Sequence, residues 1–424
     1  MNSKNKLFTI IFLFFSLIFF SCSNNSSKYD KFILWTDREE FVSYAEFFNS
    51  IQDKTKIVVV YKERLASSLP PARDEETPDL IAGTFLNNEN KREFFRPVDF
   101  LLSEDSINSS NFYKPLLDYG KSNGTQYLLP VSFNIPLVIF SKKNEKLLTN
   151  QYMLSLDEIK ESAAAFNQKN KNGFYTNMGF APSWDEDFVY LVTKEFGPCF
   201  FEKGNSFIWD EEKLLNSIEY VKDWTTQKND STTVEQDFEF KYLYTPKYRQ
   251  IAQNRTLFAF ISSEEFFRRA EEQSAEIDYR WVSINQKIPV KDDIVTMGIY
   301  KHSKNPKKAA EFVEWFFQEE NQKLLLERSS VMKLDSQTFG ISRGFSSLKN
   351  VNIYLFPSYY SNLLGNLPTE QMLSSPQQFP SRWESLQERV IFPFLMEAIK
   401  TDSQNEVAFS RLEELLNAWS KQFN

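Results

Sequence analysis

The chain has 424 residues, with 49 Lys and Arg against 57 Asp and Glu, so its formal net charge is −8. This acidic balance argues against a nucleic-acid partner. The length beyond residue 21 is too great for one ordinary hydrophobic core and predicts two lobes.

Residues 1–21 have the order of a signal peptide. Lys4 and Lys6 precede an apolar run from residue 7 to residue 20, and Ser21 and Cys22 follow it. A membrane-spanning helix needs about 20 apolar residues, so we expect cleavage rather than a span. A small residue followed by Cys is typical of bacterial lipoprotein processing, which predicts acylation of Cys22, for example with palmitate. Because Phe19 and Phe20 depart from the usual pattern, ordinary secretion and a retained signal anchor remain alternatives.

Residues 22–29 are polar and are expected to form a flexible, lipidated leash to a bilayer. Cleavage removes two lysines and no acid, which changes the net charge from −8 to −10. Cys199 is then the remaining thiol, so the sequence predicts no internal disulfide and no Cys-rich metal site. We expect Cys199 to be a small buried residue.

The mature chain opens with strand and helix patterns that alternate. Residues 32–36 form a short apolar run, and residues 38–51 repeat apolar side chains at helical spacing. Residues 56–61 are rich in β-branched side chains, and residues 79–83 form a third short run. The order strand, helix, strand, strand indicates a parallel sheet.

Residues 127–144 form two extended runs interrupted by Pro130 and Pro136, which predicts a crossing between lobes. Helical patterns follow, strands return, and Asn305-Pro306 begins another helix through a cap and an N1 proline. Because strands return after a helical middle, we expect each lobe to be built from discontinuous segments. The patterns predict helices at 154–166, 188–196 and 211–224, strands at 281–284 and 294–300, and a last amphipathic helix carrying Leu412, Leu415, Leu416, Trp419 and Phe423.

An ordered set of segments resembles one family, the extracellular solute-binding proteins (family 1) of carbohydrate-type ABC importers, which includes the maltodextrin-binding proteins. The set comprises FILWTD (32–37), TPDLI (77–81), the crossing at 124–144, IAQNRTLFAFISSEEFF (251–267) and the strand, Asn-Pro turn and helix of 298–327. Asn254, Arg255 and Thr256 replace the family's usual Gly-Lys-Ala, and the hydrophobic-Pro pair after the strand around Trp281 is missing.

The resemblance implies an α/β, two-lobed periplasmic-binding fold of type II. The N-terminal lobe is expected to contain residues 30–133 and 286–330, and the C-terminal lobe residues 137–283 and 334–424. The two lobes are expected to close over a small solute at hinge crossings.

The resemblance also implies where ligand contacts lie. Sugars present C–H faces and a rim of hydroxyls, so their sites combine aromatic rings with carboxylates and amides. Because aromatic residues are 16% of the chain, the alternative is that Trp184 and Trp383 belong to the core. Solvated carboxylates are the alternative for Asp37 and Glu264. The candidate ligand contacts are Asp37, Arg38, Thr84, Phe133, Asn134, Ser183, Trp184, Asp185, Ser262, Ser263, Glu264 and Trp383.

Enzymatic alternatives find less support in the sequence. Residues 340–344, GISRG, fit the nucleophile-elbow pattern, but that pattern requires a later histidine. The single histidine, His302, lies upstream and in a polar turn, which argues against Ser-His hydrolysis and weakens metal catalysis. A pair of carboxylates could still form a glycoside hydrolase, although no pair stands out.

The predicted function is therefore capture of a small solute, a sugar or an oligosaccharide, and its delivery to an ABC permease. We expect a monomer, anchored by lipid in the bacterial cell envelope and facing the periplasm or the exterior, with no cofactor, no metal and no catalytic residue. The departures from the family pattern favour a lipid-anchored surface receptor or adhesin as the second reading, and a glycoside hydrolase is the third. If the ring of Trp383 stacks on a sugar, Trp383→Ala should weaken binding about tenfold or more.

Overall fold

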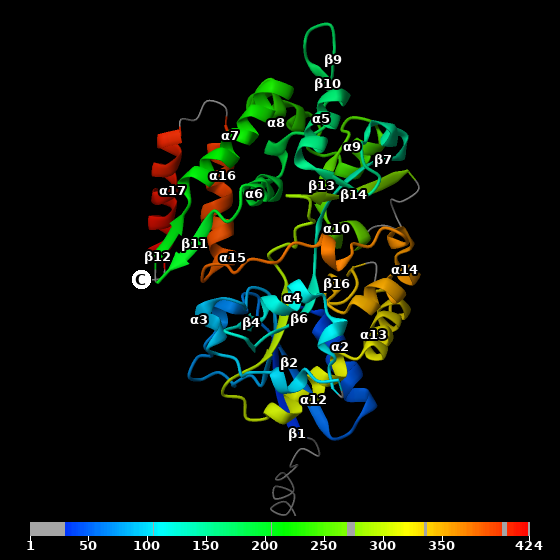
Figure 1. Cartoon of the computed structure of the whole chain (residues 1–424), viewed down its shortest axis with the longest axis vertical. Coiled ribbons are helices and arrows are strands. Elements are labelled where there is room, and N and C mark those ends of the chain that lie inside the picture. The colour runs from blue at the N-terminus through cyan, green and yellow to red at the C-terminus, as the bar shows by residue number, and fades with distance from the viewer. Residues whose placement is uncertain are drawn as a thin grey trace, which may run out of the picture.

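The computed structural model describes residues 30–422, with the exception of residues 105, 205, 269–275, 335–336 and 401–404. The predicted signal peptide, the leash and Cys22 lie outside the described residues. Among the helices of the described part, none combines the length and the apolar character needed to cross a membrane. Two bodies lie one above the other, and segments of chain pass between them (Figure 1).

The first lobe is built on a mixed six-stranded sheet with the order β16-β6-β15-β3-β1-β2. The strands β2, β1 and β3 are parallel, whereas β15 is antiparallel to both β3 and β6. The strands are β1 (Asp30–Thr36), β2 (Thr55–Tyr61), β3 (Leu80–Gly83), β6 (Leu129–Phe133), β15 (Val295–Ile299) and β16 (Phe345–Ser346).

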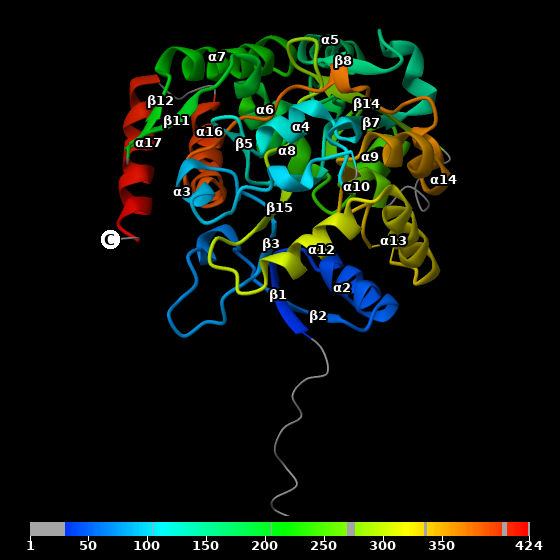
Figure 2. The ribbon, with the colours of Figure 1, turned by 60° about the horizontal axis from the view of Figure 1, so that its bottom comes forward.

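Aromatic contacts join two helices that lie beside this sheet. The helix α2 (Glu40–Ile51) lies beside α12 (Pro306–Phe316), and Figure 2 shows the pair next to β1 and β2. Phe48 packs edge-on against Phe312 with 5.3 Å between ring centroids, and Phe41 stacks on Phe316 at 5.8 Å. The helix α12 begins at Pro306, directly after Asn305, which confirms the predicted N1 proline, but the side chain of Asn305 makes no cap hydrogen bond to this helix.

The second lobe contains a four-stranded sheet with the order β13-β7-β14-β8, in which β7 is antiparallel to both neighbours. Its strands are β7 (Pro136–Ser141), β8 (Met153–Ser155), β13 (Ala259–Ser262) and β14 (Ile277–Ser283). Its main helices are α5 (Leu156–Phe166), α6 (Glu186–Glu195), α7 (Glu211–Lys228), α16 (Phe392–Ala398) and α17 (Asn405–Ser420). Three of them lie where the helical patterns predict helices, at 154–166, 188–196 and 211–224.

Smaller elements complete both bodies. They are α3 (Glu89–Arg92), α4 (Lys114–Tyr119), β4 (Lys121–Ser122), β5 (Thr125–Gln126), β9 (Gln168–Lys169), β10 (Tyr175–Asn177), β11 (Phe200–Lys203), β12 (Ser206–Trp209), α8 (Thr232–Lys241), α9 (Lys247–Ala252), α10 (Ser263–Arg268), α13 (Glu319–Val331), α14 (Phe356–Tyr359) and α15 (Trp383–Leu386). Buried Cys199 lies in the apolar core of the second lobe.

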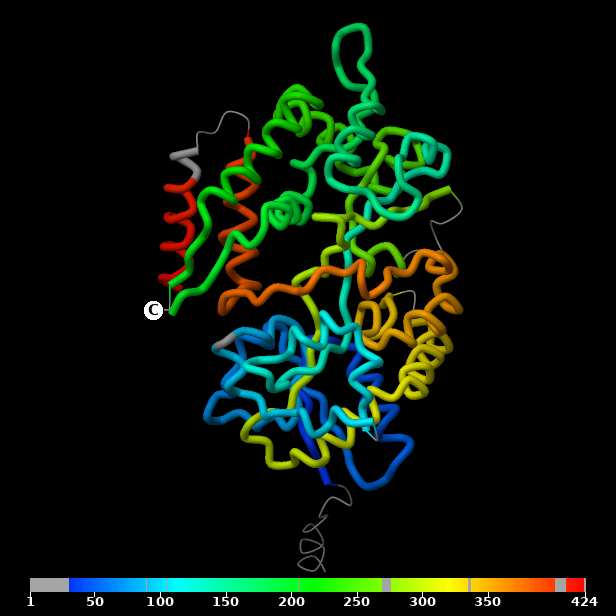
Figure 3. Tube along the Cα trace, viewed as in Figure 1, coloured from blue at the N-terminus to red at the C-terminus, as the bar shows by residue number. Residues whose placement is uncertain are grey.

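Within the residues that the structure describes, three segments of chain connect the two bodies, and Figure 3 traces them through the middle of the molecule. The first crossing is the short link between β6 and β7, and the second runs from β14 to β15. The main-chain N–H of Lys291 donates to the carbonyl of Asn134 at 2.9 Å, which joins these two crossings. The third crossing lies between α14 (Phe356–Tyr359) and α15 (Trp383–Leu386). It runs alongside the second, because the N–H of Ser374 donates to the carbonyl of Ile288 at 2.9 Å.

The third crossing does not lie where the sequence placed it. The predicted boundary assigned residues 334–424 to the second lobe, but β16 lies within that range and pairs with β6 of the first sheet. Phe345 of β16 packs against Phe133 with 5.7 Å between ring centroids. A strand of two residues has no periodicity that a sequence pattern could reveal. The other lobe boundaries stay predictions.

Candidate functional site

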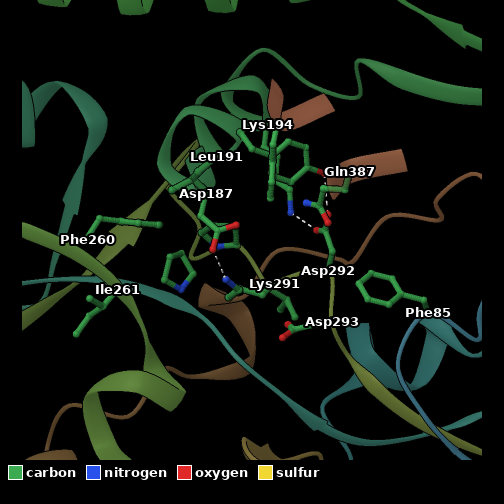
Figure 4. A pocket seen from close by; sticks show the side chains of 15 residues that line it. Phe85, Asp187, Leu191, Lys194, Phe260, Ile261, Lys291, Asp292, Asp293 and Gln387 are labelled. Carbon is green, nitrogen blue, oxygen red and sulfur yellow. Dashed lines mark hydrogen bonds and ion pairs between the residues drawn. The ribbon is translucent and has the colours of Figure 1, made fainter. Parts of the chain in front are cut away.

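A pocket of about 190 Å³ lies between the two bodies, beside the crossings (Figure 4). The helix α6, the strand β13 and the second crossing form most of its wall. Phe85 follows β3 of the first lobe and also packs against the apolar core of the second lobe. The lining residues are Phe85, Pro136, Asp187, Tyr190, Leu191, Lys194, Phe260, Ile261, Pro289, Val290, Lys291, Asp292, Asp293, Gln387 and Phe392.

Two ion pairs join α6 to the second crossing within this pocket (Figure 4). Lys291 Nζ lies 3.0 Å from a carboxylate oxygen of Asp187, and Lys194 pairs with Asp292. Burial alone would lower the pKa of Lys291, but the carboxylates of Asp187 and Asp293 outweigh burial and raise it. Lys291 is therefore a permanent cation of the pocket wall.

Asp292 anchors the second crossing to the core of the second lobe. Its Oδ2 accepts hydrogen bonds from the hydroxyl of Tyr190 at 2.7 Å and from Nε1 of Trp383 at 3.2 Å. Because these donors come from α6 and α15, the hydrogen bonds fix the position of the second crossing relative to both helices.

The ends of β1 and β3 bring three predicted residues together. Asp37 Oδ2 accepts hydrogen bonds from the main-chain N–H of Thr84 at 3.0 Å and from its hydroxyl at 2.7 Å. Arg38 Nε lies 3.7 Å from the other oxygen of Asp37, which is too far for a hydrogen bond. Burial raises the pKa of Asp37, although Arg38 and Thr84 oppose the shift.

Two further predicted residues, Asn134 and Ser263, form the hydrogen-bonded centre of the hinge. The hydroxyl of Ser263 donates to Oδ1 of Asn134 at 2.7 Å, and Nδ2 of Asn134 donates to the carbonyl of Arg343 at 2.8 Å. Arg343 lies in the GISRG turn, and its φ of 63° is in the left-handed region. Its guanidinium donates to Glu40 at 2.9 Å, so this turn holds a cation beside the crossings.

Glu264 and Glu384 are half-buried carboxylates that face this same region. Burial, followed by the charge of Asp293, raises the pKa of Glu264, and the cations Arg38, Arg343 and Arg268 oppose the shift. Burial, followed by the charge of Asp37, raises the pKa of Glu384. Glu264 is among the predicted contacts, whereas Glu384, which follows Trp383 in the sequence, is not.

The remaining predicted contacts lie elsewhere. Phe133 is buried against Tyr113 and Phe345, and Ser262 caps α10 by accepting from the N–H of Glu265 at 3.1 Å. Trp383 is 2% exposed and stacks on Phe379. These positions differ from the prediction, because both rings are enclosed by other aromatic side chains and cannot reach a ligand in this conformation.

Ser183, Trp184 and Asp185 lie in the second lobe at a distinct place. Trp184 and Asp185 line a smaller pocket of about 60 Å³, with Lys247 2.8 Å from Asp185. The hydroxyl of Ser183 contacts the buried carboxyl of Glu235 at 2.5 Å. The two pockets share Phe260 as a wall residue.

Sequence reasoning missed most of the wall of the larger pocket. Asp187 and Lys194 are seven residues apart on α6 and share one face, and residues 291–293 read Lys-Asp-Asp directly after an apolar stretch. These two signals were present, but only the folded crossing shows that they meet.

A family model matches more than half of this chain. The model of the family described as "Bacterial extracellular solute-binding protein" matches residues 54–323. No curated protein matches the chain at the sequence level.

Solved structures similar to this chain carry carbohydrate names. They include the cyclic α-maltosyl-1,6-maltose binding protein of Arthrobacter globiformis (14% identity, 92% of this chain and 99% of that chain, TM-score 0.62), the galacto-N-biose/lacto-N-biose I-binding protein of Bifidobacterium longum (15%, 94% and 99%, 0.61) and the substrate-binding protein Lmo0181 of Listeria monocytogenes in complex with cycloalternan (12%, 94% and 99%, 0.61). At such identity the likeness shows the fold, and it confirms the predicted two-lobed α/β architecture.

Proposed function

The chain belongs to the bacterial extracellular solute-binding protein family, and on that premise we propose that it binds a sugar or oligosaccharide between its lobes for an ABC importer. The observation that carries the proposal is the pocket beside the three crossings. Apolar and aromatic side chains line it together with Asp187, Lys291 and Gln387. Such a mixture matches the C–H faces and hydroxyls of a sugar.

The rest of the proposal concerns the setting of that binding event. Acylated Cys22 anchors the protein to a bilayer at the cell envelope, and the protein acts as a monomer that delivers its solute to a membrane permease. It performs no covalent chemistry on the solute. The carbohydrate names of structurally similar proteins support the choice of solute class.

Thermal unfolding with a panel of oligosaccharides tests this function. A ligand present at 100 times its Kd should stabilise the folded protein by about 2.7 kcal/mol. A rise in Tm with one group of sugars, and recovery of those sugars unchanged after long incubation, is the expected result. No shift with any sugar would favour a surface receptor or adhesin, and cleavage products would favour a glycoside hydrolase.

One contact across the lobes offers a test of closure. Arg64, which follows β2, lies 3.1 Å from Glu388 of the second lobe, and the two side chains are 43% and 59% exposed. If the lobes close over solute, Arg64→Ala should weaken binding by up to about fivefold, because an exposed ion pair contributes about 0.2–1 kcal/mol. Isothermal titration with the sugar identified above measures this change.

The matched control is Arg411→Ala. Arg411 is also 43% exposed and lies 3.1 Å from Glu397, but both partners belong to the second lobe. The Arg411→Ala protein should bind the sugar with the affinity of the parent protein. The double exchange of Arg64→Glu with Glu388→Arg should restore binding. Equal losses in both alanine variants would argue that the Arg64 contact has no part in closure.

A further inference from the structure

A further pocket lies on the first lobe, where the end of α3, the hairpin of β4 and β5 and the turn after β15 meet (Figure 1). This outer pocket has a volume of about 340 Å³ and shares no lining residue with the pocket between the lobes. Its wall contains three cations, two hydroxyl groups and one acid, which are Arg92, Arg96, Lys301, Ser122, Tyr127 and Glu93. Donors of hydrogen bonds therefore dominate its polar lining.

Arg92 is a buried cation in this wall. The residue is only 9% exposed, and two neutral groups orient its guanidinium. Its Nε donates to Oδ1 of Asn87 at 3.0 Å, and its Nη1 donates to the hydroxyl of Ser122 at 2.8 Å. These two bonds fix the planar group from two directions, so the outer pocket is built around a positive charge whose position is fixed.

Arg96 and Lys301 are held side by side by main-chain pairing. The N–H of Arg96 donates to the carbonyl of Ile299 at 2.9 Å, and the N–H of Lys301 donates to the carbonyl of Phe94 at 2.7 Å. Nε of Arg96 also donates to the carbonyl of Lys301 at 3.0 Å. Within the residues that the structure describes, neither side chain forms an ion pair, and the ammonium of Lys301 makes no hydrogen bond. Both charges are therefore available to a ligand.

Nearby carboxylates do not cancel the charge of the outer pocket. Glu93, the acid in its wall, is exposed to solvent. Arg96 also lines an adjoining pocket that contains Glu311 and Glu314, but Glu311 is paired with Lys308 at 3.4 Å and Glu314 accepts a hydrogen bond. Three cations against one acid leave the wall positive, although the chain as a whole carries a net charge of −8.

We propose that the outer pocket binds a phosphate group through Arg96 and Lys301, with Arg92 supplying a fixed charge in the wall. The planar fork of a guanidinium matches two phosphate oxygens, and an ammonium adds a charge-assisted hydrogen bond. The hydroxyls of Ser122 and Tyr127 are further donors. A phosphate fills only part of the pocket, which leaves room for the molecule that carries it.

Two kinds of molecule supply this group, a soluble phosphate compound and a phospholipid headgroup. The proposed acylation of Cys22 brings headgroups near the first lobe, because the leash joins this lobe at β1. Isothermal titration with inorganic phosphate and with glycerol 3-phosphate tests the soluble source. Sedimentation of the mature protein carrying Cys22→Ser with phosphatidylglycerol vesicles tests the lipid source without an acyl anchor. Added sodium chloride should weaken either interaction, because screening acts on the charge.

Arg96→Gln and Lys301→Gln should each weaken phosphate binding about tenfold, because each removes a charge-assisted hydrogen bond. Arg96→Lys should recover part of the loss, since it restores the charge and not the planar fork. Glu93→Gln should tighten binding by up to about fivefold, because it removes an exposed like charge from the wall. Arg73→Gln is the matched control: it removes an exposed cation that lies outside the pocket, so binding should not change.

Equal Tm values would show that these variants keep the fold of the parent. Absence of binding from both phosphate sources, or equal phosphate affinity in the parent and Arg96→Gln proteins, would overturn the inference. The proposed function would stand in either case, because neither Arg96 nor Lys301 lines the pocket between the lobes. Sugar affinity should accordingly be the same in all of these variants.

Discussion

Replacement of Trp383 by alanine should lower the free energy of unfolding by about 3–5 kcal/mol, because it removes a fully buried aromatic ring. The ring is 2% exposed and stacks on Phe379 with 5.0 Å between centroids and 12° between planes. Phe200 and Tyr190 lie at 5.8 and 6.1 Å. The substitution therefore leaves a large cavity lined by three aromatic side chains.

The substitution also removes a buried hydrogen bond. Nε1 of Trp383 donates to Asp292, which also accepts from Tyr190 and pairs with Lys194. Alanine removes one of the donors that satisfy this buried carboxylate. Urea denaturation followed by circular dichroism measures the change in unfolding free energy.

Trp383→Phe provides the control, since it keeps most of the ring contacts and removes the donor. It should cost clearly less than alanine, and the difference between the two variants isolates the cavity. The sequence predicts that, if the ring of Trp383 stacks on a sugar, Trp383→Ala weakens sugar binding about tenfold or more. A stable Trp383→Ala protein whose sugar affinity falls about tenfold would support that expectation over the present one.

Trp383 also illustrates what a sequence reveals about a site. Aromatic residues suit a sugar platform and a core equally well, and FPSRWESL contains no feature that separates the two uses. The ring is enclosed by residues that are distant in sequence, from α6 and from the strand β11. Burial of this kind depends on tertiary packing, so the sequence left both readings open.

Other parts of the fold followed from local chemistry. Regular periodicity predicted α2 and its buried face through Phe41, Tyr44, Ala45 and Phe48, although Ile51 at its end is 51% exposed. The third crossing could not be predicted, because β16 has two residues and is recognisable only through its partner β6. A long helix or strand shows a hydrophobic periodicity in the sequence, whereas a very short strand is recognisable only through the strand with which it pairs.

Glu235 provides the second large prediction, which concerns stability against pH. This residue of α8 is fully buried, and burial raises the pKa of its carboxyl from 4.5 to about 7. The hydroxyl of Ser183 lies 2.5 Å and Nδ2 of Asn229 2.7 Å from its two oxygens. These hydrogen bonds favour the anion, but they do not offset the burial.

The sign of the effect follows from proton linkage. Between about pH 4.5 and about pH 7 the folded protein holds a proton on Glu235 that the unfolded chain has lost. The contribution of Glu235 to stability is therefore greatest below pH 4.5, declines as the pH rises through this window and stays low above it. At one pKa unit per 1.36 kcal/mol, the whole decline amounts to about 3 kcal/mol.

Glu235→Gln should remove that decline, because glutamine keeps the shape of the protonated acid and does not ionise. Its stability should match that of the parent near pH 4.5 and exceed it by up to about 3 kcal/mol near pH 8. Urea titrations at several pH values measure the difference, and Asp237→Asn, which changes an exposed acid of the same helix, should leave the profile of the parent unchanged. A difference between Glu235→Gln and the parent that is the same at every pH would mean that the Glu235 carboxyl titrates as it does in the unfolded chain.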